Sequence, residues 1–195
     1  RIEDNYLTKV RARYIRYVRK FKKEYSVSIL EGEAIEESFV DTYMKIHIKD
    51  AGGLFRPRDS YVALTELAKA GLAFFCVASC VKTKKVVGVL FTVLFKGQAY
   101  DGSVAIDPDY EHKYVSHVLK WKTIETLIQR KAKDYELGVK SEFPTLDRQP
   151  DNKNYGISFF KDGWARGNER EILVAEKFLE DPEAYGPQNQ LPPVF

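Results

Sequence analysis

Long apolar runs, cysteines and an excess of one charge are all scarce in this chain of 195 residues. No apolar stretch reaches the roughly 20 residues that a membrane-spanning helix needs, and we expect no secretory signal peptide. The 31 basic and 28 acidic side chains give a net charge of only +3, so whole-chain charge does not indicate a nucleic-acid binder. The first residue is Arg1 rather than methionine, and we therefore expect a piece of a longer protein.

Only two cysteines are present, Cys76 and Cys80, four residues apart in one strand-like run. This spacing places them on the same face but roughly 13 Å apart, too far for a mutual disulfide. We expect buried free thiols, which are compatible with a cytoplasmic protein. His112 and His117 lack metal-ligand spacing to the cysteines, and no base is paired with Cys76, so we expect neither a metal site nor a cysteine nucleophile. A phosphate-binding P-loop and a nucleotide-binding glycine fingerprint are also missing.

Apolar residues make up 44% of the chain, enough to bury the core of one globular domain. The strongly basic segment 7–24 carries an apolar stripe at helical spacing, formed by Val10, Tyr14, Tyr17 or Val18, and Phe21. This pattern predicts an amphipathic helix. Its cations are either simply solvated or bind an anionic ligand such as a phosphate.

The period of the apolar residues predicts the remaining elements. The predicted helices are residues 34–50, ended by Gly52-Gly53; 61–70, capped by Asp59 or Ser60; 114–133; and 157–161. The predicted strands are residues 25–30, 73–81, 86–95, 98–106, 135–139 and 171–177. Because three hairpin-type strands precede one helix-connected strand, we expect a mixed, mainly antiparallel sheet flanked by helices, an α/β (α+β) fold.

Two segments fall outside this regular pattern. Residues 140–155 contain Pro144 and Pro150 and are too long for a simple connection, so we expect them to cover a substrate. The residues from Asp181 onward are rich in proline, which predicts an extended tail outside the core. We therefore expect one domain over residues 1–180 and a proline-rich tail over 181–195.

The order of these elements resembles the GNAT acyltransferase fold. Four segments further resemble the FemAB (FemABX) peptidyltransferase family: residues 9–16 with 25–27, residues 119–125, Tyr135-Glu136-Leu137-Gly138, and Phe160-Lys161-Asp162-Gly163-Trp164. The resemblance covers residues 9 to 177. FemAB proteins usually carry two GNAT-like domains, so this chain is similar to one of them, of the C-terminal type, and a second such domain of the same chain is an expected partner.

The resemblance implies a cytoplasmic N-acyltransferase that moves an acyl or aminoacyl group to a small-molecule or precursor amine, in cell-wall or polysaccharide precursor biosynthesis. It implies no tightly bound cofactor and a donor that is aminoacyl-tRNA or acyl-CoA. In CoA-dependent GNAT enzymes a glycine-rich loop before the long helix cradles the pyrophosphate. Here residues 108–116 contain no glycine, and Asp109 and Glu111 would repel a diphosphate, which favours a tRNA partner. A conventional acyl-CoA-dependent N-acetyltransferase and a non-catalytic GNAT-like binding module remain the alternatives.

Lys161 is the main catalytic candidate that the resemblance implies. Its ammonium would stabilise the oxyanion that develops when an amine attacks the acyl carbonyl. Phe160 and Trp164 would shield that site and offer a cation–π face. The alternative is a solvated lysine that extends from a surface helix.

Other candidates follow from position. Glu136, before Gly138, is either a base with a raised pKa or an exposed acid at a strand end. Tyr100 and Asp101 face opposite sides of their strand, and we expect Tyr100 to carry or position a proton. With Lys161 and Phe160, these two complete the catalytic candidates. The candidate substrate-binding residues are Trp164, Ser116, Trp121, Lys9, Arg13 and Tyr155.

Overall fold

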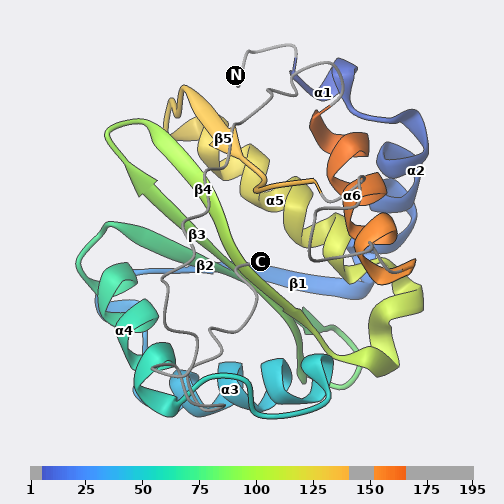
Figure 1. Ribbon diagram of the computed structural model, residues 1–195. Coiled ribbons are helices and arrows are strands. Elements are labelled where there is room, and N and C mark those ends of the chain that lie inside the picture. The colour runs from blue at the N-terminus through green and yellow to red at the C-terminus, as the bar shows by residue number, and fades with distance from the viewer. Residues whose placement is uncertain (1–5, 141–151, 166–195) are drawn as a thin grey trace, which may run out of the picture.

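The computed structural model describes residues 6–140 and 152–165. Five strands form one sheet in the order β1-β2-β3-β4-β5 (Figure 1). The strands are β1 (Tyr25–Leu30), β2 (Ala73–Cys80), β3 (Val86–Phe95), β4 (Gln98–Ile106) and β5 (Asp134–Glu136). Strands β1 to β4 pair antiparallel, whereas β5 runs parallel to β4. The predicted mixed, mainly antiparallel sheet is confirmed.

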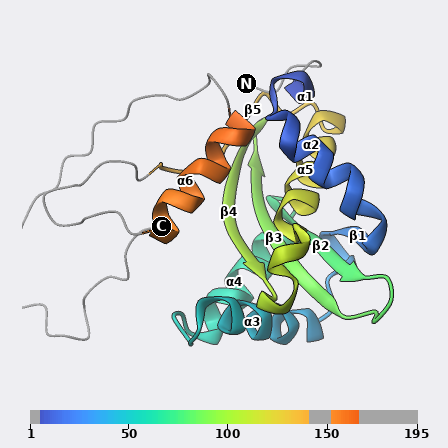
Figure 2. The same cartoon turned by 90° about the vertical axis from the view of Figure 1, so that its right-hand side faces the viewer.

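Helices cover both faces of the sheet (Figures 1 and 2). On one face, α3 (Ser38–Ala51) and α4 (Arg58–Lys69) pack over a core that includes Tyr43, Tyr61 and Phe75. On the other face, α5 (Val115–Gln129) lies across the strands and buries Leu119 against Leu90. The helices α1 (Tyr6–Lys9), α2 (Ala12–Phe21) and α6 (Asn152–Ala165) join α5 through a third apolar cluster. Burial of these apolar faces is the main force that holds the layers together.

The strands agree with the sequence prediction better than the helices do. The bounds of β1, β3 and β4 are those predicted, and β2 ends one residue early, at Cys80. The predicted helix 34–50 begins only at Ser38, because the short 3-10 helix η2 (Gly32–Ala34) and the extended residue Ile35 occupy its start. The predicted helix 114–133 ends at Gln129, where the chain turns through Lys131 at φ 56°.

The end of α3 agrees with the sequence prediction, whereas the start of α4 does not. Gly52, at φ 77°, ends α3 and donates its N–H to the carbonyl of Ile48, as its predicted role requires. By contrast, α4 begins directly after Pro57 and has no side-chain cap bond, so the predicted cap by Asp59 or Ser60 is wrong.

The predicted helix over residues 7–24 is split in two. Arg11 is extended, with ψ 121°, and its N–H donates to the carbonyl of Gly163 at 2.9 Å instead of continuing a helix. After α2 the chain continues into the 3-10 helix η1 (Lys22–Glu24). The apolar stripe itself is confirmed, because Tyr14 and Val18 expose only 3% and 2% of their surface.

Strands β4 and β5 separate after a short stretch of pairing. Their pairing covers three residues on each strand and ends at Tyr100 opposite Glu136. The register of β3 and β4 shifts at Gly102, where an added Cβ atom would lie 2.9 Å from the Phe91 ring. On the other side, Gly138 has φ +76°, which ends the predicted strand 135–139 early and turns the chain away. The two strands therefore diverge beyond Tyr100.

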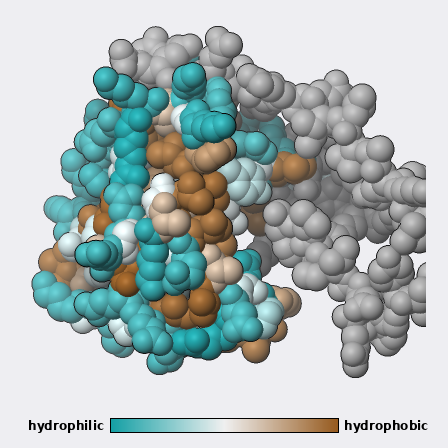
Figure 3. Space-filling model, turned by 90° about the vertical axis from the view of Figure 1, so that its left-hand side faces the viewer, coloured by the Kyte–Doolittle hydropathy of each residue, from teal (hydrophilic) through white to brown (hydrophobic). Residues whose placement is uncertain are grey.

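Exposed apolar side chains occur along this part of the sheet. Phe95, Tyr100 and Val104 expose 53%, 39% and 45% of their surface. From the side of the β3–β4 hairpin, apolar surface runs as a band across the face between polar margins (Figure 3). Strand β4 thus combines apolar surface with the few polar groups described below.

Several predictions fall wholly or partly outside the described residues. These include most of the loop 140–155, the strand 171–177 and the tail 181–195. Helix α6 begins at Asn152, so it is longer than the predicted helix 157–161. Both cysteines are free, but only Cys76 is buried and Cys80 is half-buried. Within residues 6–140 and 152–165, no helix is both long and apolar enough to cross a membrane.

Candidate active site

Lys161 reaches from α6 into the place where β4 and β5 diverge. Its Nζ donates a hydrogen bond to the carbonyl of Val139 at 2.7 Å. A Cβ atom built on Gly138 would lie 3.3 Å from Nζ of Lys161 and 4.0 Å from the hydroxyl oxygen of Tyr100. The glycine therefore leaves room for both groups, and it also provides the positive φ that the turn requires.

The electrostatic surroundings of Lys161 differ from those of a solvated lysine. Burial lowers the pKa of its ammonium, the nearby Lys120 cation lowers it further, and the Asp101 carboxylate opposes both effects. Lys161 is half-buried, so a solvent-facing role alone does not describe it. A half-buried cation suits the stabilisation of a developing oxyanion.

A buried charge network lies next to Lys161. Lys120 of α5 forms a close ion pair with Asp101 of β4, and their side chains expose 4% and 14% of their surface. Lys120 Nζ also donates to the hydroxyl of Tyr135 at 3.0 Å. Burial, and then the charge of Asp101, raises the pKa of Tyr135 well above its ordinary value. The three residues form one hydrogen-bonded unit behind the divergence of the strands.

One oxygen of this unit has no partner. Oδ1 of Asp101 is buried and accepts no hydrogen bond from any residue that the structure describes, although the Tyr135 hydroxyl lies close by. A buried acceptor without a donor costs about 1–3 kcal/mol or more. Replacing a buried ion pair with apolar residues is often neutral or stabilising, so the pair is weak support for a purely stabilising role.

The sequence prediction missed Lys120 and gave Asp101 no role. A signal was available, because Lys120 lies three residues after His117 and four before Ile124, on the buried side of α5. A lysine on an apolar helix face indicates a buried partner. The identity of that partner depends on how α5 crosses β4, which the sequence does not reveal.

The two aromatic residues of the Lys161 motif have structural positions. Trp164 is completely buried, and its ring lies 5.4 Å from that of Tyr14. Phe160 contacts Tyr14 and His117, with ring centroids 5.8 Å and 5.0 Å apart. Among the described residues, no cation–π contact joins Lys161 to either ring. These rings hold α6 against α2 and α5, and their expected shielding and ligand-binding roles stay predictions.

His117 is the centre of this aromatic cluster, which also includes Tyr17 and Tyr114. Burial lowers the pKa of His117 to about 4, so the ring is neutral at physiological pH. Its Nδ1 lies 3.4 Å from the hydroxyl oxygen of Ser116, which places this candidate next to the cluster. Its Nε2 is buried without a partner among the described residues.

The remaining candidates lie apart from Lys161 or on the surface. Trp121 donates from Nε1 to Glu125 at 2.6 Å, within its own helix. Glu136 ends β5 as an exposed side chain, paired in register with Tyr100. The other three candidates are exposed on α1, α2 and α6: Lys9, Arg13 and Tyr155. Among the predicted residues, Lys161 and Tyr100 both adjoin Gly138 at the divergence, and Glu136 pairs in register with Tyr100 there.

The start of α5, where the glycine-poor segment lies, has an unusual backbone. Residues Pro108–Lys113 form the 3-10 helix η3, and Tyr114 then adopts a left-handed conformation at φ 55°. The Tyr114 ring stacks on Tyr17 of α2, with centroids 3.8 Å apart. Asp109 is exposed and pairs with Lys49 at 2.7 Å, which offsets part of its charge. The first turn of α5 is thus joined directly to α2.

Comparisons with known proteins agree with this architecture. The family model described as an acetyltransferase (GNAT) domain matches residues 8–148. FemX is 13% identical with a TM-score of 0.62, over 83% of this chain and 55% of FemX, so the chain spans about half of that protein. An aminoglycoside acetyltransferase, meta-AAC0020, from an uncultured soil metagenomic sample and solved with sisomicin, is 13% identical with a TM-score of 0.57, over 83% of this chain and 99% of that one.

A third structure, AAC(6')-Iy in complex with a CoA-derived bisubstrate analogue, is 12% identical with a TM-score of 0.52, over 79% of this chain and 99% of that one. Among curated protein sequences, none matches the chain. At these identities the similar structures show the fold alone. The family model covers well over half of the residues, and the chain belongs to the GNAT acetyltransferase domain family.

Proposed function

We propose that this chain is an N-acyltransferase of the FemAB type, which transfers an acyl or aminoacyl group to an amine acceptor. Membership of the GNAT family supplies the reaction class. The observation that carries the proposal is the position of Lys161, half-buried at the divergence of β4 and β5 and beside Gly138, which also adjoins the Tyr100 hydroxyl.

The proposed reaction assigns a role to each of these groups. The acceptor nitrogen attacks the acyl carbonyl carbon, a C–N bond forms, and the carbonyl oxygen becomes an oxyanion beside the Lys161 ammonium. The intermediate then collapses, and the bond to the leaving oxygen or sulfur breaks. The proton released by the amine passes to the leaving group through Tyr100, whose hydroxyl both accepts and donates.

For the donor we propose aminoacyl-tRNA. The face of α2 and η1 that points to solvent carries six exposed cations without ion-pair partners in the described ranges: Arg13, Arg16, Arg19, Lys20, Lys22 and Lys23. Residues 6–23 contain no acidic side chain. Arg13 also acts electrostatically on Tyr114, which precedes α5. A cluster of exposed cations suits a phosphate backbone.

Acyl-CoA is the second candidate donor, because the similar structure of AAC(6')-Iy holds a CoA-derived analogue. The segment before α5 has no glycine, and the Tyr114 ring stacks on Tyr17 at the point where helix amides would meet a diphosphate. This arrangement favours the tRNA donor over CoA. The free cysteines favour a reducing compartment such as the cytoplasm, where a precursor amine is the acceptor that we propose.

Calorimetry and filter binding test the donor. We expect aminoacyl-tRNA to bind with an affinity that falls steeply as salt rises, because phosphate contacts release counterions. We expect no saturable heat signal with acetyl-CoA at ordinary assay concentrations. Saturable acetyl-CoA binding in the micromolar range would assign the chain to the conventional acetyltransferases.

A further inference from the structure

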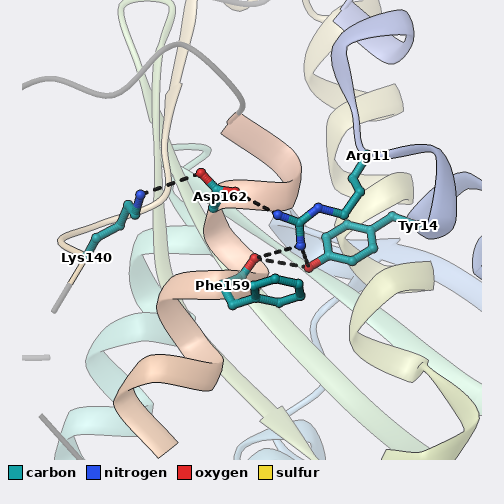
Figure 4. Close-up of polar contacts among 5 residues, drawn as sticks. All are labelled: Arg11, Tyr14, Lys140, Phe159 and Asp162. Atoms are coloured by element: carbon teal, nitrogen blue, oxygen red, sulfur yellow. Dashed lines mark hydrogen bonds and ion pairs between the residues drawn. The ribbon is translucent and has the colours of Figure 1, made fainter. Parts of the chain in front are cut away.

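Helix α6 presents Lys161 to the site, and the residue that follows it is tied to two other parts of the fold. Asp162 Oδ2 lies 2.7 Å from Nη2 of Arg11, at the break between α1 and α2. Asp162 Oδ1 lies 3.6 Å from Nζ of Lys140, which follows β5. Figure 4 shows Asp162 between these two cations.

Arg11 is itself fixed by several contacts. Its guanidinium lies 3.9 Å from the centre of the Phe159 ring, a cation–π distance. Nη1 donates to the Phe159 carbonyl and to the Tyr14 hydroxyl, both at 3.4 Å, and the backbone N–H of Arg11 donates to the Gly163 carbonyl at 2.9 Å. One arginine thus contacts α6 on both sides of Lys161 in sequence.

Lys161 and Asp162 contact two successive residues that follow β5. Lys161 bonds to the carbonyl of Val139, and Asp162 pairs with the next residue, Lys140. Two successive residues of α6 therefore hold two successive residues after β5. A shift of α6 by one residue along its axis would break both contacts and would move Lys161 away from Gly138.

We propose, resting on the acyl-transfer function proposed above, that Arg11 and Asp162 are positioning residues for Lys161. They fix the rotation and height of α6 so that the Lys161 ammonium stays at the divergence of β4 and β5. Neither residue touches the reacting atoms. Their effect on turnover passes entirely through the placement of Lys161.

The test is Asp162→Asn, which keeps the size of the side chain but removes its charge. We expect kcat to fall about tenfold to a hundredfold with little change in KM, since a displacement of about 1 Å at a reacting group has such an effect. Asp162→Glu, which keeps the carboxylate, should restore part of the rate. Asp41→Asn is the matched control, because it breaks another Arg–Asp pair on a helix, with Arg58 at 3.2 Å, and should leave kcat unchanged.

The second readout is the pKa of Lys161, followed by NMR of its side chain. If α6 shifts, Lys161 gains solvent, the burial that lowers its pKa is lost, and the pKa rises in Asp162→Asn. Loss of the Asp162 charge alone would act in the opposite direction, because removal of a nearby anion lowers the pKa of a lysine. An unchanged or lowered pKa, together with unchanged turnover, would overturn the proposal.

The same readout separates this proposal from the proposed function. If Lys161→Ala leaves turnover intact while Asp162→Asn still raises the Lys161 pKa, the positioning stands and the catalytic role of Lys161 fails. Should Asp162→Asn not fold, Arg11→Lys is the second variant. It keeps the charge but loses the planar fork, so it should give the same pKa rise, and a pKa equal to that of the parent would reject the proposal.

Discussion

At the scale of single residues, Lys161 combines a short hydrogen bond to a carbonyl with partial burial. We expect Lys161→Ala to lower turnover by roughly a hundredfold or more, the loss typical of removing one oxyanion-stabilising donor. Thermal unfolding should change little, because this side chain is not part of an apolar cluster. Lys161→Arg should rescue poorly, since a planar guanidinium does not reproduce a compact ammonium. Turnover of the alanine variant within a few-fold of the parent would return Lys161 to a surface role.

His117 predicts a pH dependence of stability. Its pKa is lowered to about 4 in the folded chain, from 6.5 when unfolded, so the unfolded state takes up the proton first as pH falls. Stability linked to this group is present above pH 6.5 and is lost on the way down to about pH 4. We expect a loss of about 2–3 kcal/mol between neutral pH and about pH 4.5.

Urea unfolding at the two pH values measures this loss. His117→Phe keeps an aromatic ring in the cluster but does not titrate, so its stability should depend less on pH by about the same amount. His47 also has a lowered pKa and remains in both proteins, which cancels its contribution. Equal pH dependence in parent and variant would show that His117 is accessible to protons when folded.

At the scale of elements, α6 packs against Tyr14 of α2 at Gly163. A Cβ atom on this residue would overlap the Tyr14 ring. Gly163→Ala should therefore destabilise the protein by about 1–3 kcal/mol or more, the usual result of overpacking. Gly156→Ala on the same helix is the matched control, because no atom lies within 4 Å of its added Cβ.

In Gly156→Ala we expect unchanged or slightly greater stability, by about 0.5–1 kcal/mol, from the better helix propensity of alanine. Thermal unfolding of both variants measures these changes in stability. Similar melting of Gly163→Ala and Gly156→Ala would mean that α6 does not pack on Tyr14 in solution.

At the scale of the whole molecule, the net charge is small but the charges are unevenly distributed. The total is only +3, yet the fully exposed charged side chains of α2 and η1 are all basic. We expect Arg13→Gln with Arg16→Gln to weaken tRNA binding and to reduce the salt dependence by about one counterion for each cation removed. The control pair Lys45→Gln and Lys131→Gln makes the same charge change away from α2. Equal losses in both pairs would indicate non-specific attraction only.

Local sequence patterns were enough to predict most of the sheet. Alternating and β-branched residues in β1, β3 and β4 gave their bounds, because a strand pattern depends on nearest neighbours along the chain. The apolar stripe through Tyr14 and Val18 likewise required only helical periodicity. Lys161 was found from a motif rather than from a physical pattern, and the burial of its motif partner Trp164 was not predicted.

The surroundings of Lys161 depend on how distant parts of the chain pack together. The pairing of Lys120 with Asp101 depends on the path of α5 over β4, and the contact of Arg11 with Asp162 joins residues 151 positions apart. The break at Arg11 also follows from its bond to Gly163, since nothing in its neighbours stops a helix. Local sequence specifies periodicity, whereas the partner of a charged side chain is set by packing across the fold. For this protein, the positions of most helices and strands could be predicted from the sequence. The surroundings of the candidate site could not, because they form only when these elements pack together.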